Sequence, residues 1–286
     1  MSKALSMFLS KSLIRILFPC LIFSSITAQY SPSSLKQAWQ MPVAIFSLLI
    51  LSFLGGRLLV GTFGRLPPSE RGTFRFMAMM PNYIFLPLPI CAYFWGERGV
   101  ATLVFSTLGA EIAMWTIAVP QIRSHVSALR GLLTPPLLTL ITALAVVLID
   151  NHLWNSEIAE VRPHLKGVGS AAVPVSLFLL ASHFARTGLP GSLSNWSRHL
   201  SLAGFHLGVL PLLCLGVLNL IPLAPEQERI LFLVSMMPTA VASVFISEMF
   251  SGNPQLAAEQ VVISHLLAVV TIPLWLYYGM PILTSG

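Results

Sequence analysis

Met79-Met80-Pro81-Asn82 and Met236-Met237-Pro238-Thr239 interrupt two long apolar stretches of the chain in the same way. The two prolines lie 157 positions apart in a chain of 286 residues. Proline removes a backbone donor and clashes with the preceding turn, so each stretch is predicted to be a broken helix. Paired broken helices at matching positions in two halves are typical of membrane transporters that bind their substrate near the middle of the bilayer.

The composition is that of a polytopic membrane protein. Hydrophobic residues make up 55% of the chain and charged residues 9%, whereas a soluble protein carries roughly 25% charged residues. The net charge of +6 is therefore interpreted as a topology signal, and no nucleic-acid partner is expected. Cys20, Cys91 and Cys214 all lie in apolar runs without metal-ligand spacing, so no metal site or disulfide is expected.

About nine apolar segments are long enough to cross roughly 30 Å of hydrocarbon. They cover residues 10–28, 42–62, 73–95, 99–120, 132–150, 168–186, 200–221, 230–250 and 258–280. The first is expected to be retained, because Lys11 and Arg15 interrupt the apolar core that a signal peptide needs. The longest connection, near residues 150–167, is expected to be an acidic loop. The predicted fold class is an all-α membrane protein.

The two broken segments are the third and the eighth, so they cross the membrane in opposite directions. That arrangement is typical of an inverted repeat. Segments one to four then match segments six to nine, and the fifth has no mate. The chain is therefore predicted to follow a five-plus-five design that lacks its first helix.

Cations are unevenly divided between the two ends of the predicted segments. Connections on the N-terminal side hold nine of them and the opposite side five: Lys3, Lys11, Arg65, Arg71, Arg75, Arg123, Arg130, Arg186 and Arg198 against Lys36, Arg98, Arg162, Lys166 and Arg229. The positive-inside rule then predicts a cytoplasmic N-terminus, an extracytoplasmic C-terminus and a multi-pass location in the cell (inner) membrane.

Several motifs along the chain resemble motifs of one protein family. They are Leu17-Phe18-Pro19-Cys20-Leu21-Ile22-Phe23-Ser24-Ser25, Pro81-Asn82-Tyr83-Ile84-Phe85-Leu86-Pro87-Leu88-Pro89, Trp115-Thr116, Thr134-Pro135, Met237-Pro238-Thr239-Ala240-Val241 and Ile272-Pro273-Leu274. In this order they resemble helix motifs of the auxin efflux carrier family, to which the plant PIN carriers belong. Leu86 stands where the family commonly has glycine, and Thr134 replaces its usual asparagine.

The resemblance implies a fold related to the bile-acid/sodium symporters, with inverted repeats and two crossing broken helices. It also implies elevator-like transport of a small organic anion by a single domain, residues 1–286. Residues 5–30 and 132–187 would then form a scaffold, and residues 42–121 and 199–280 a transport unit. A homodimer is among the expected assemblies, and a proton or sodium ion among the expected coupling ions.

The breaks themselves supply the first candidate site residues. At Pro81 and Pro238, freed backbone groups and half-helix dipoles favour an anion, and the Asn82 amide would bond a carboxylate or an ion. The alternative is that Asn82 only caps the second half-helix. Thr239, with Ser235 and Ser243 nearby, is the counterpart in the second break; a hydroxyl that bonds its own helix is the alternative there. Tyr83 follows Asn82 within the same motif.

Other polar residues inside the apolar segments are weighed in the same way. Glu111 is the acid nearest to the middle of any segment, and it is predicted to bind a coupling proton or cation, the alternative being a packing role. Ser176 and Ser182 flank the stripe of the sixth segment that, in the related fold, should face the site. The histidines of the later segments are interpreted mainly as packing residues: His183, His206 and His265.

The preferred function is a secondary transporter of a small organic anion. The chain carries no enzyme motif, so it is not expected to be an enzyme, and it has no phosphate-binding loop or cofactor motif. Two alternatives stay open: a cation/proton antiporter with Glu111 as the ion ligand, and a membrane sensor that binds ligand without transport. The sequence does not name the substrate, the coupling ion or the direction of transport.

Overall fold

The protein is all-α in the computed structural model, which describes residues 3–123, 133–149, 152–184, 193–218 and 222–281. Its elements are α1 (Lys3–Ser12), π-helix η1 (Leu13–Leu17), α2 (Phe18–Gln29), α3 (Pro32–Ala38), α4 (Gln40–Gly61), α5 (Pro68–Met79), α6 (Pro87–Ala113), π-helix η2 (Met114–Ala118), α7 (Val119–Ile122), α9 (Pro135–Ile149), α10 (His152–Ser170), α11 (Ala172–Phe184), α12 (Leu193–Gly204), π-helix η3 (Phe205–Val209), α13 (Leu210–Leu218), α14 (Pro225–Ser235), α15 (Ala242–Met249) and α16 (Pro254–Tyr278).

Several of these helices are built to cross a membrane. Four described runs are long and apolar enough to do so alone: Pro32–Gly61, Pro87–Ile122, Trp196–Gly216 and Pro254–Tyr278. Leu13–Gln29 and Pro135–Ile149 are shorter apolar helices. The protein is thus an all-α membrane protein as predicted, while the count of nine crossings stays a prediction.

The two breaks predicted from the prolines are present, and they meet. The first runs between α5 and α6, the second between α14 and α15. Pro81 and Thr239 form an isolated antiparallel β-bridge. The Asn82 N–H donates to the Pro238 carbonyl at 2.7 Å, and the Ala240 N–H donates to the Met80 carbonyl at 2.9 Å. Backbone groups freed by each break are therefore satisfied by the other break, as buried backbone requires at membrane depth.

The helix boundaries repeat with the same offset as the prolines. Pro68 opens α5 and Pro225 opens α14, again 157 positions apart. α6 changes direction at Gly96, whose φ of 58° and ψ of −150° suit a residue without a Cβ. Its continuation from Glu97 lies 157 positions before Pro254, the start of α16. The repeat inferred from the two breaks thus extends along the helices around them.

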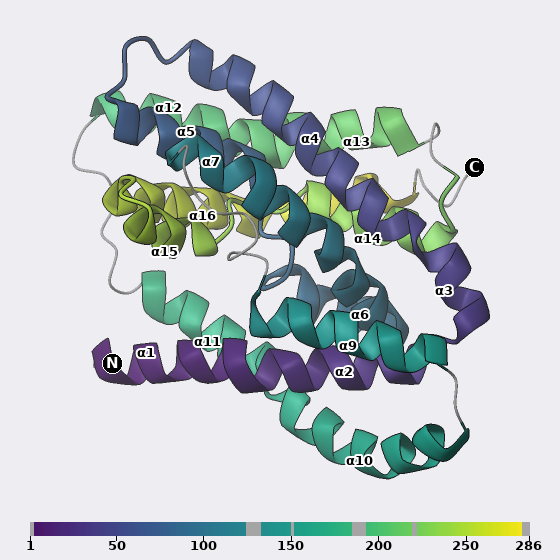
Figure 1. Cartoon of the computed structure of the whole chain (residues 1–286). Helices are drawn as coiled ribbons and strands as arrows, with labels where there is room; N and C mark the ends of the chain where they lie inside the picture. Colours follow the sequence, from purple (N-terminus) through teal and green to yellow (C-terminus); the bar gives the residue numbers. More distant parts are fainter. Residues whose placement is uncertain (1–2, 124–132, 150–151, 185–192, 219–221, 282–286) are drawn as a thin grey trace.

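Figure 1 shows two groups of helices with α6 between them. α1, α2, α9, α10 and α11 gather along the lower edge of the view, and α2 packs against both α9 and α10. α4, α5, α7 and α12 to α16 gather above, where α4 packs against α5 and α6. The lower group lies mostly in the stretches expected to be scaffold and the upper group mostly in those expected to be transport unit, and this division stays a prediction.

The prediction of an acidic loop near residues 150–167 was wrong, because residues 152–170 form helix α10. Polar side chains separate this stretch from its apolar neighbours, so hydropathy alone marks it as a connection. Its first eleven residues nevertheless contain no glycine or proline, and Pro163 is tolerated inside it. The backbone of α10 approaches α2 closely at Gly169, where an added Cβ would lie 2.6 Å from the Leu21 nitrogen.

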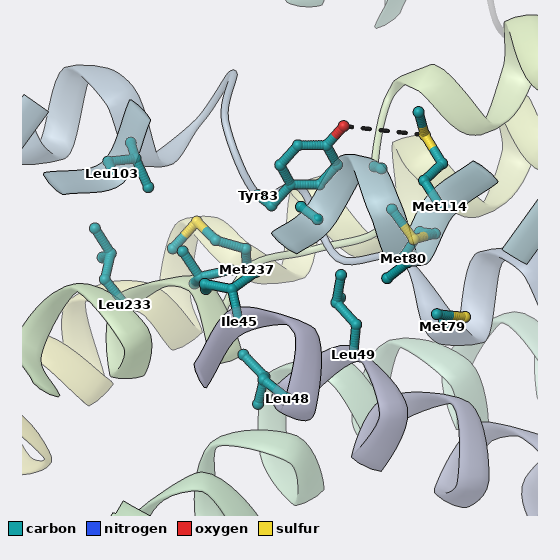
Figure 2. Close-up of a cluster of buried hydrophobic side chains, with 14 of the residues drawn as sticks. Ile45, Leu48, Leu49, Met79, Met80, Tyr83, Leu103, Met114, Leu233 and Met237 are labelled. Atoms are coloured by element: carbon teal, nitrogen blue, oxygen red, sulfur yellow. Dashed lines mark hydrogen bonds between the residues drawn. The ribbon is translucent and has the colours of Figure 1, made fainter. Parts of the chain in front are cut away.

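Methionines from both breaks form the core around the crossing. Met79, Met80, Met236 and Met237 are fully buried. Figure 2 shows Met79, Met80 and Met237 beside Ile45, Leu48 and Leu49 of α4. On the far side of these methionines the Tyr83 ring extends towards Met114, with its hydroxyl 3.9 Å from the Met114 sulfur. α4 therefore packs against one side of the crossing, and the Tyr83 side chain points away from its other side.

Ion pairs connect residues that the sequence places on one side of the membrane. Arg98 Nε lies 2.9 Å from Glu226 Oε2, and Lys166 pairs with Glu97. These four residues all belong to the side predicted to be extracytoplasmic.

The C-terminus is predicted to lie on that same side. A reporter fused after Gly286 is therefore expected to be active as alkaline phosphatase and dark as green fluorescent protein. The opposite pattern in otherwise stable fusions would overturn the predicted orientation.

Candidate functional site

A cavity of 380 Å³ lies beside the crossing, between the two groups of helices. Its wall is mostly apolar, and it receives side chains from η1, α2, α9 and α11 on one side and from the first break, α6 and α15 on the other. The apolar contributors include Leu13, Phe18, Ile22, Phe85, Val104, Leu137, Leu179, Phe245 and Ile246; the polar ones are Tyr83, Thr107, Glu111, Thr134 and Ser176. Such a pocket suits a small, mainly apolar ligand with a few polar anchors.

Glu111 is the one carboxyl group in this lining, and it is held from two sides. The Tyr83 hydroxyl donates to Oε1 at 2.9 Å, and Trp115 Nε1 donates to Oε2 at 3.0 Å. Trp115 lies one turn after Glu111, whereas Tyr83 comes from the break. The carboxyl group thus links the break to the helix behind it, and its remaining lone pairs face a cavity. The lining holds no lysine, arginine or histidine.

The second half of each broken helix, α6 in the first and α15 in the second, begins at the cavity. Ile84 and Phe85 precede α6, and Val241 and Ala242 begin α15, and all four line the pocket. The helix dipole makes the starting end of a helix positive. Two such ends at one cavity give it a positive region that comes from the two helix dipoles.

The structure sorts the predicted site residues into two sets. Tyr83, Glu111 and Ser176 line the cavity. Ser176 also donates to the carbonyl of Val173 in its own helix. Ser182 likewise donates to the Leu179 carbonyl and is not part of the lining. The side chain of His183 lies outside the described part of the chain.

The second set is buried at the crossing and is absent from the cavity lining: Pro81, Asn82, Pro238, Thr239 and Ser243. Asn82 Oδ1 accepts from the Phe85 N–H at 3.1 Å, in the turn that precedes α6, whose N-cap residue is Leu86. Its Nδ2 lies 3.4 Å from His265 Nε2. The Ser243 hydroxyl has no hydrogen-bond partner among the described residues. A ligand-binding role for these residues stays a prediction.

Thr239 has more polar neighbours than the sequence suggested. Its N–H donates to Ser264 Oγ at 3.3 Å, and its hydroxyl lies 3.4 Å from both Gln260 Nε2 and His206 Nδ1. Sequence reasoning passed over Gln260 and Ser264 and gave His206 a packing role. A signal was present, since Gln260, Ser264 and His265 follow one another at helical spacing in an apolar segment, where polar groups are costly.

Comparison with known proteins agrees with this architecture. A family described as membrane transport proteins matches residues 2–127 and 119–276. The chain therefore belongs to this membrane transport family, and its resemblance to the auxin efflux carriers is confirmed. A relative in Methanocaldococcus jannaschii, described as an uncharacterized transporter, is 24% identical over 273 residues, which cover 93% of this chain and 87% of the relative. The protein is thus a membrane transporter.

Proposed function

We propose that the protein is a secondary transporter that moves a small, mainly apolar organic anion together with a proton. The observation that carries the proposal is the cavity beside the crossing, where two half-helix starts and the Glu111 carboxyl group meet. The half-helix starts favour the anionic group of the substrate. The apolar wall would hold the rest of the molecule.

Glu111 supports coupling to a proton. An ionised Glu111 would repel an anion in the same cavity, because the lining offers no side-chain cation to offset it. A protonated Glu111 removes this repulsion. Substrate and proton would then favour each other's binding, as reciprocal linkage requires. One proton would cross the membrane with each monovalent anion.

The position of the cavity supports an elevator-like cycle. Side chains from both groups of helices line it, so a movement of one group past the other would change which side of the membrane it faces. The broken helices α5–α6 and α14–α15, the first of which carries Glu111, would move with the substrate. Ser176, on α11, belongs to the other group and would be left behind.

Transport by purified protein in liposomes tests this proposal. Radiolabelled monocarboxylates of increasing chain length would be offered with and without a pH gradient, after a thermal-shift screen has selected those that stabilise the protein by mass action. Uptake driven by the gradient is the expected result. Ligand binding without flux under every gradient would instead favour the sensor that the sequence left open.

A cation/proton antiporter is the second candidate, favoured by the same carboxyl group. Glu111 would then alternate between a proton and a cation, and the apolar wall would only exclude water. A pH-sensitive dye inside the liposomes separates the two functions. Sodium or potassium would change the internal pH without any organic anion in the antiporter, and would leave it unchanged in the proposed transporter.

A further inference from the structure

Three arginines lie together on α4 and α5, away from the transport cavity. Arg57 lies one turn before the end of α4, and Arg71 and Arg75 lie one turn apart on α5. Arg75 is close enough to Arg57 and Arg71 for both charges to repel it. Like charges one turn apart destabilise a helix, and the positive starting end of α5 adds to the repulsion. A negative charge at this place would stabilise the arrangement.

The described part of the chain does not supply that charge. No acidic side chain there lies within ion-pair distance of any of the three arginines, and this includes Glu70 in the first turn of α5. Nε of Arg75 is buried and has no hydrogen-bond partner among the described residues. A buried donor without a partner is costly, so this group is suited to a ligand that accepts hydrogen bonds.

An apolar groove of 240 Å³ runs along α4 beside these arginines. It lies between α4 and the helices α13 and α14, and its lining includes Ile50, Leu54, Leu218 and Leu231. Ile50, Leu54 and Arg57 follow one another at helical spacing, so they share one stripe of α4. The groove has no lining residue in common with the transport cavity.

The distance from the groove to the arginines matches the dimensions of a lipid. Ser47 lies in the groove lining, and Arg57 follows it ten residues later on the same helix. Ten residues of α-helix rise about 15 Å, which is half of the roughly 30 Å hydrocarbon core of a bilayer. With Arg57 at the level of the head groups, an acyl chain of the same leaflet therefore reaches the whole length from Arg57 to Ser47.

We propose that Arg57, Arg71 and Arg75 bind the phosphate of an anionic phospholipid, and that one of its acyl chains lies in the groove along α4. Arginine side chains donate paired hydrogen bonds to phosphate oxygens. The three arginines adjoin the side predicted to be cytoplasmic, where the leaflet carries anionic lipids. The charge favours such a lipid over a second copy of this chain, whose own net charge is +6. The bound phosphate would link α4 to α5, the helix that leads into the first break.

Native mass spectrometry of the purified protein in detergent tests the proposal without any transport assay. The protein would be titrated with phosphatidylglycerol, with phosphatidylcholine of identical acyl chains, with glycerophosphoglycerol and with inorganic phosphate. We expect one tightly bound phosphatidylglycerol, and at least roughly tenfold weaker binding of the other three, the factor that one hydrogen bond to a charged group gives.

Each other pattern overturns the proposal. Equal affinity for the two lipids would remove the arginines from the site, since only the charge of the head group differs. Equal affinity for glycerophosphoglycerol or inorganic phosphate would show that the groove holds no acyl chain. A dimer that excludes the lipid would show that a second copy covers this face.

Substitution of the arginines separates a built site from general surface charge. Arg75→Gln should weaken phosphatidylglycerol roughly tenfold and leave phosphatidylcholine unchanged. Arg57→Gln should have the same effect, and its exposed position on α4 keeps the test valid if Arg75→Gln folds poorly. Arg15→Gln is the control, because it removes the same charge from an exposed position on η1. Equal losses in Arg15→Gln and Arg57→Gln, or no loss in Arg57→Gln, would overturn the proposal.

A second pair of variants tests the groove. Ser47→Trp places an indole ring in the groove and should weaken phosphatidylglycerol by a similar factor. Val43→Trp adds the same ring to an exposed position one turn earlier on α4, outside the lining, and should bind as wild type does. Wild-type affinity in Ser47→Trp would place the acyl chain elsewhere and overturn the proposal.

Discussion

Replacing Glu111 by glutamine should leave the protein folded and remove the coupling of transport to protons. The carboxamide oxygen still accepts from Trp115 Nε1, and its NH2 group donates to the Tyr83 oxygen, so no buried group loses its partner. Wild-type protein should accumulate a monovalent anion about tenfold across one pH unit, because one unit is worth about 1.4 kcal/mol per proton. Glu111→Gln should equilibrate the anion without accumulation.

The measurement is the ratio of internal to external radiolabelled anion in liposomes at fixed pH gradients. Glu248→Gln is the control, since Glu248 is an exposed acid that lines no part of the cavity. Glu111→Ala should also lower the thermal stability, because it leaves the Tyr83 and Trp115 donors unpaired. Undiminished accumulation by folded Glu111→Gln protein would assign Glu111 to packing and remove it from the proposed mechanism.

Gly109→Ala should be among the most destabilising single substitutions in this protein. α4 and α6 cross at Gly109, and a Cβ there would lie 1.9 Å from the Pro42 carbonyl oxygen and 2.8 Å from its carbon. Backbone cannot move aside as a flexible side chain can, so the two helices must separate. We expect a loss on the order of 4 kcal/mol or more, which is exceptional for one methyl group.

Thermal unfolding in detergent, followed by the loss of soluble folded protein, measures this effect. Gly216→Ala is the control, since an added Cβ there meets nothing within 4 Å and alanine favours a helix. It should match or slightly exceed wild type. Equal stability of Gly109→Ala and Gly216→Ala would show that the α4–α6 contact is looser than described.

The sequence predicted the features that depend on proline and hydropathy, namely the two helix breaks and the apolar helices. Pro81 and Pro238 marked both breaks. Because the broken segments are the third and the eighth, they were predicted to run in opposite directions, and their antiparallel bridge agrees with this. α10 was missed because a polar surface helix has no hydropathy signal. Its helical character depends on the absence of helix breakers and on packing against α2.

The rotation of residues around the crossing could not be predicted in the same way. A broken segment has no helical period, so nothing in the sequence shows that Tyr83 faces the cavity while its neighbour Asn82 faces His265. Glu111 could be singled out because a carboxyl group in an apolar segment stands out alone. Its hydrogen bond with Tyr83 could not be predicted, since 28 positions separate the two residues.

The methionines at the crossing bear on how freely the broken helices can shift. Branched side chains hold one shape, so a small displacement of α4 against them would open voids. An unbranched thioether has three rotatable bonds and fills irregular gaps at little cost. With Met79, Met80 and Met237 against α4, the crossing has a deformable lining at the place where the backbone itself is most constrained. Small relative movements can therefore be absorbed by side-chain rotamers while the hydrogen bonds between the breaks stay intact.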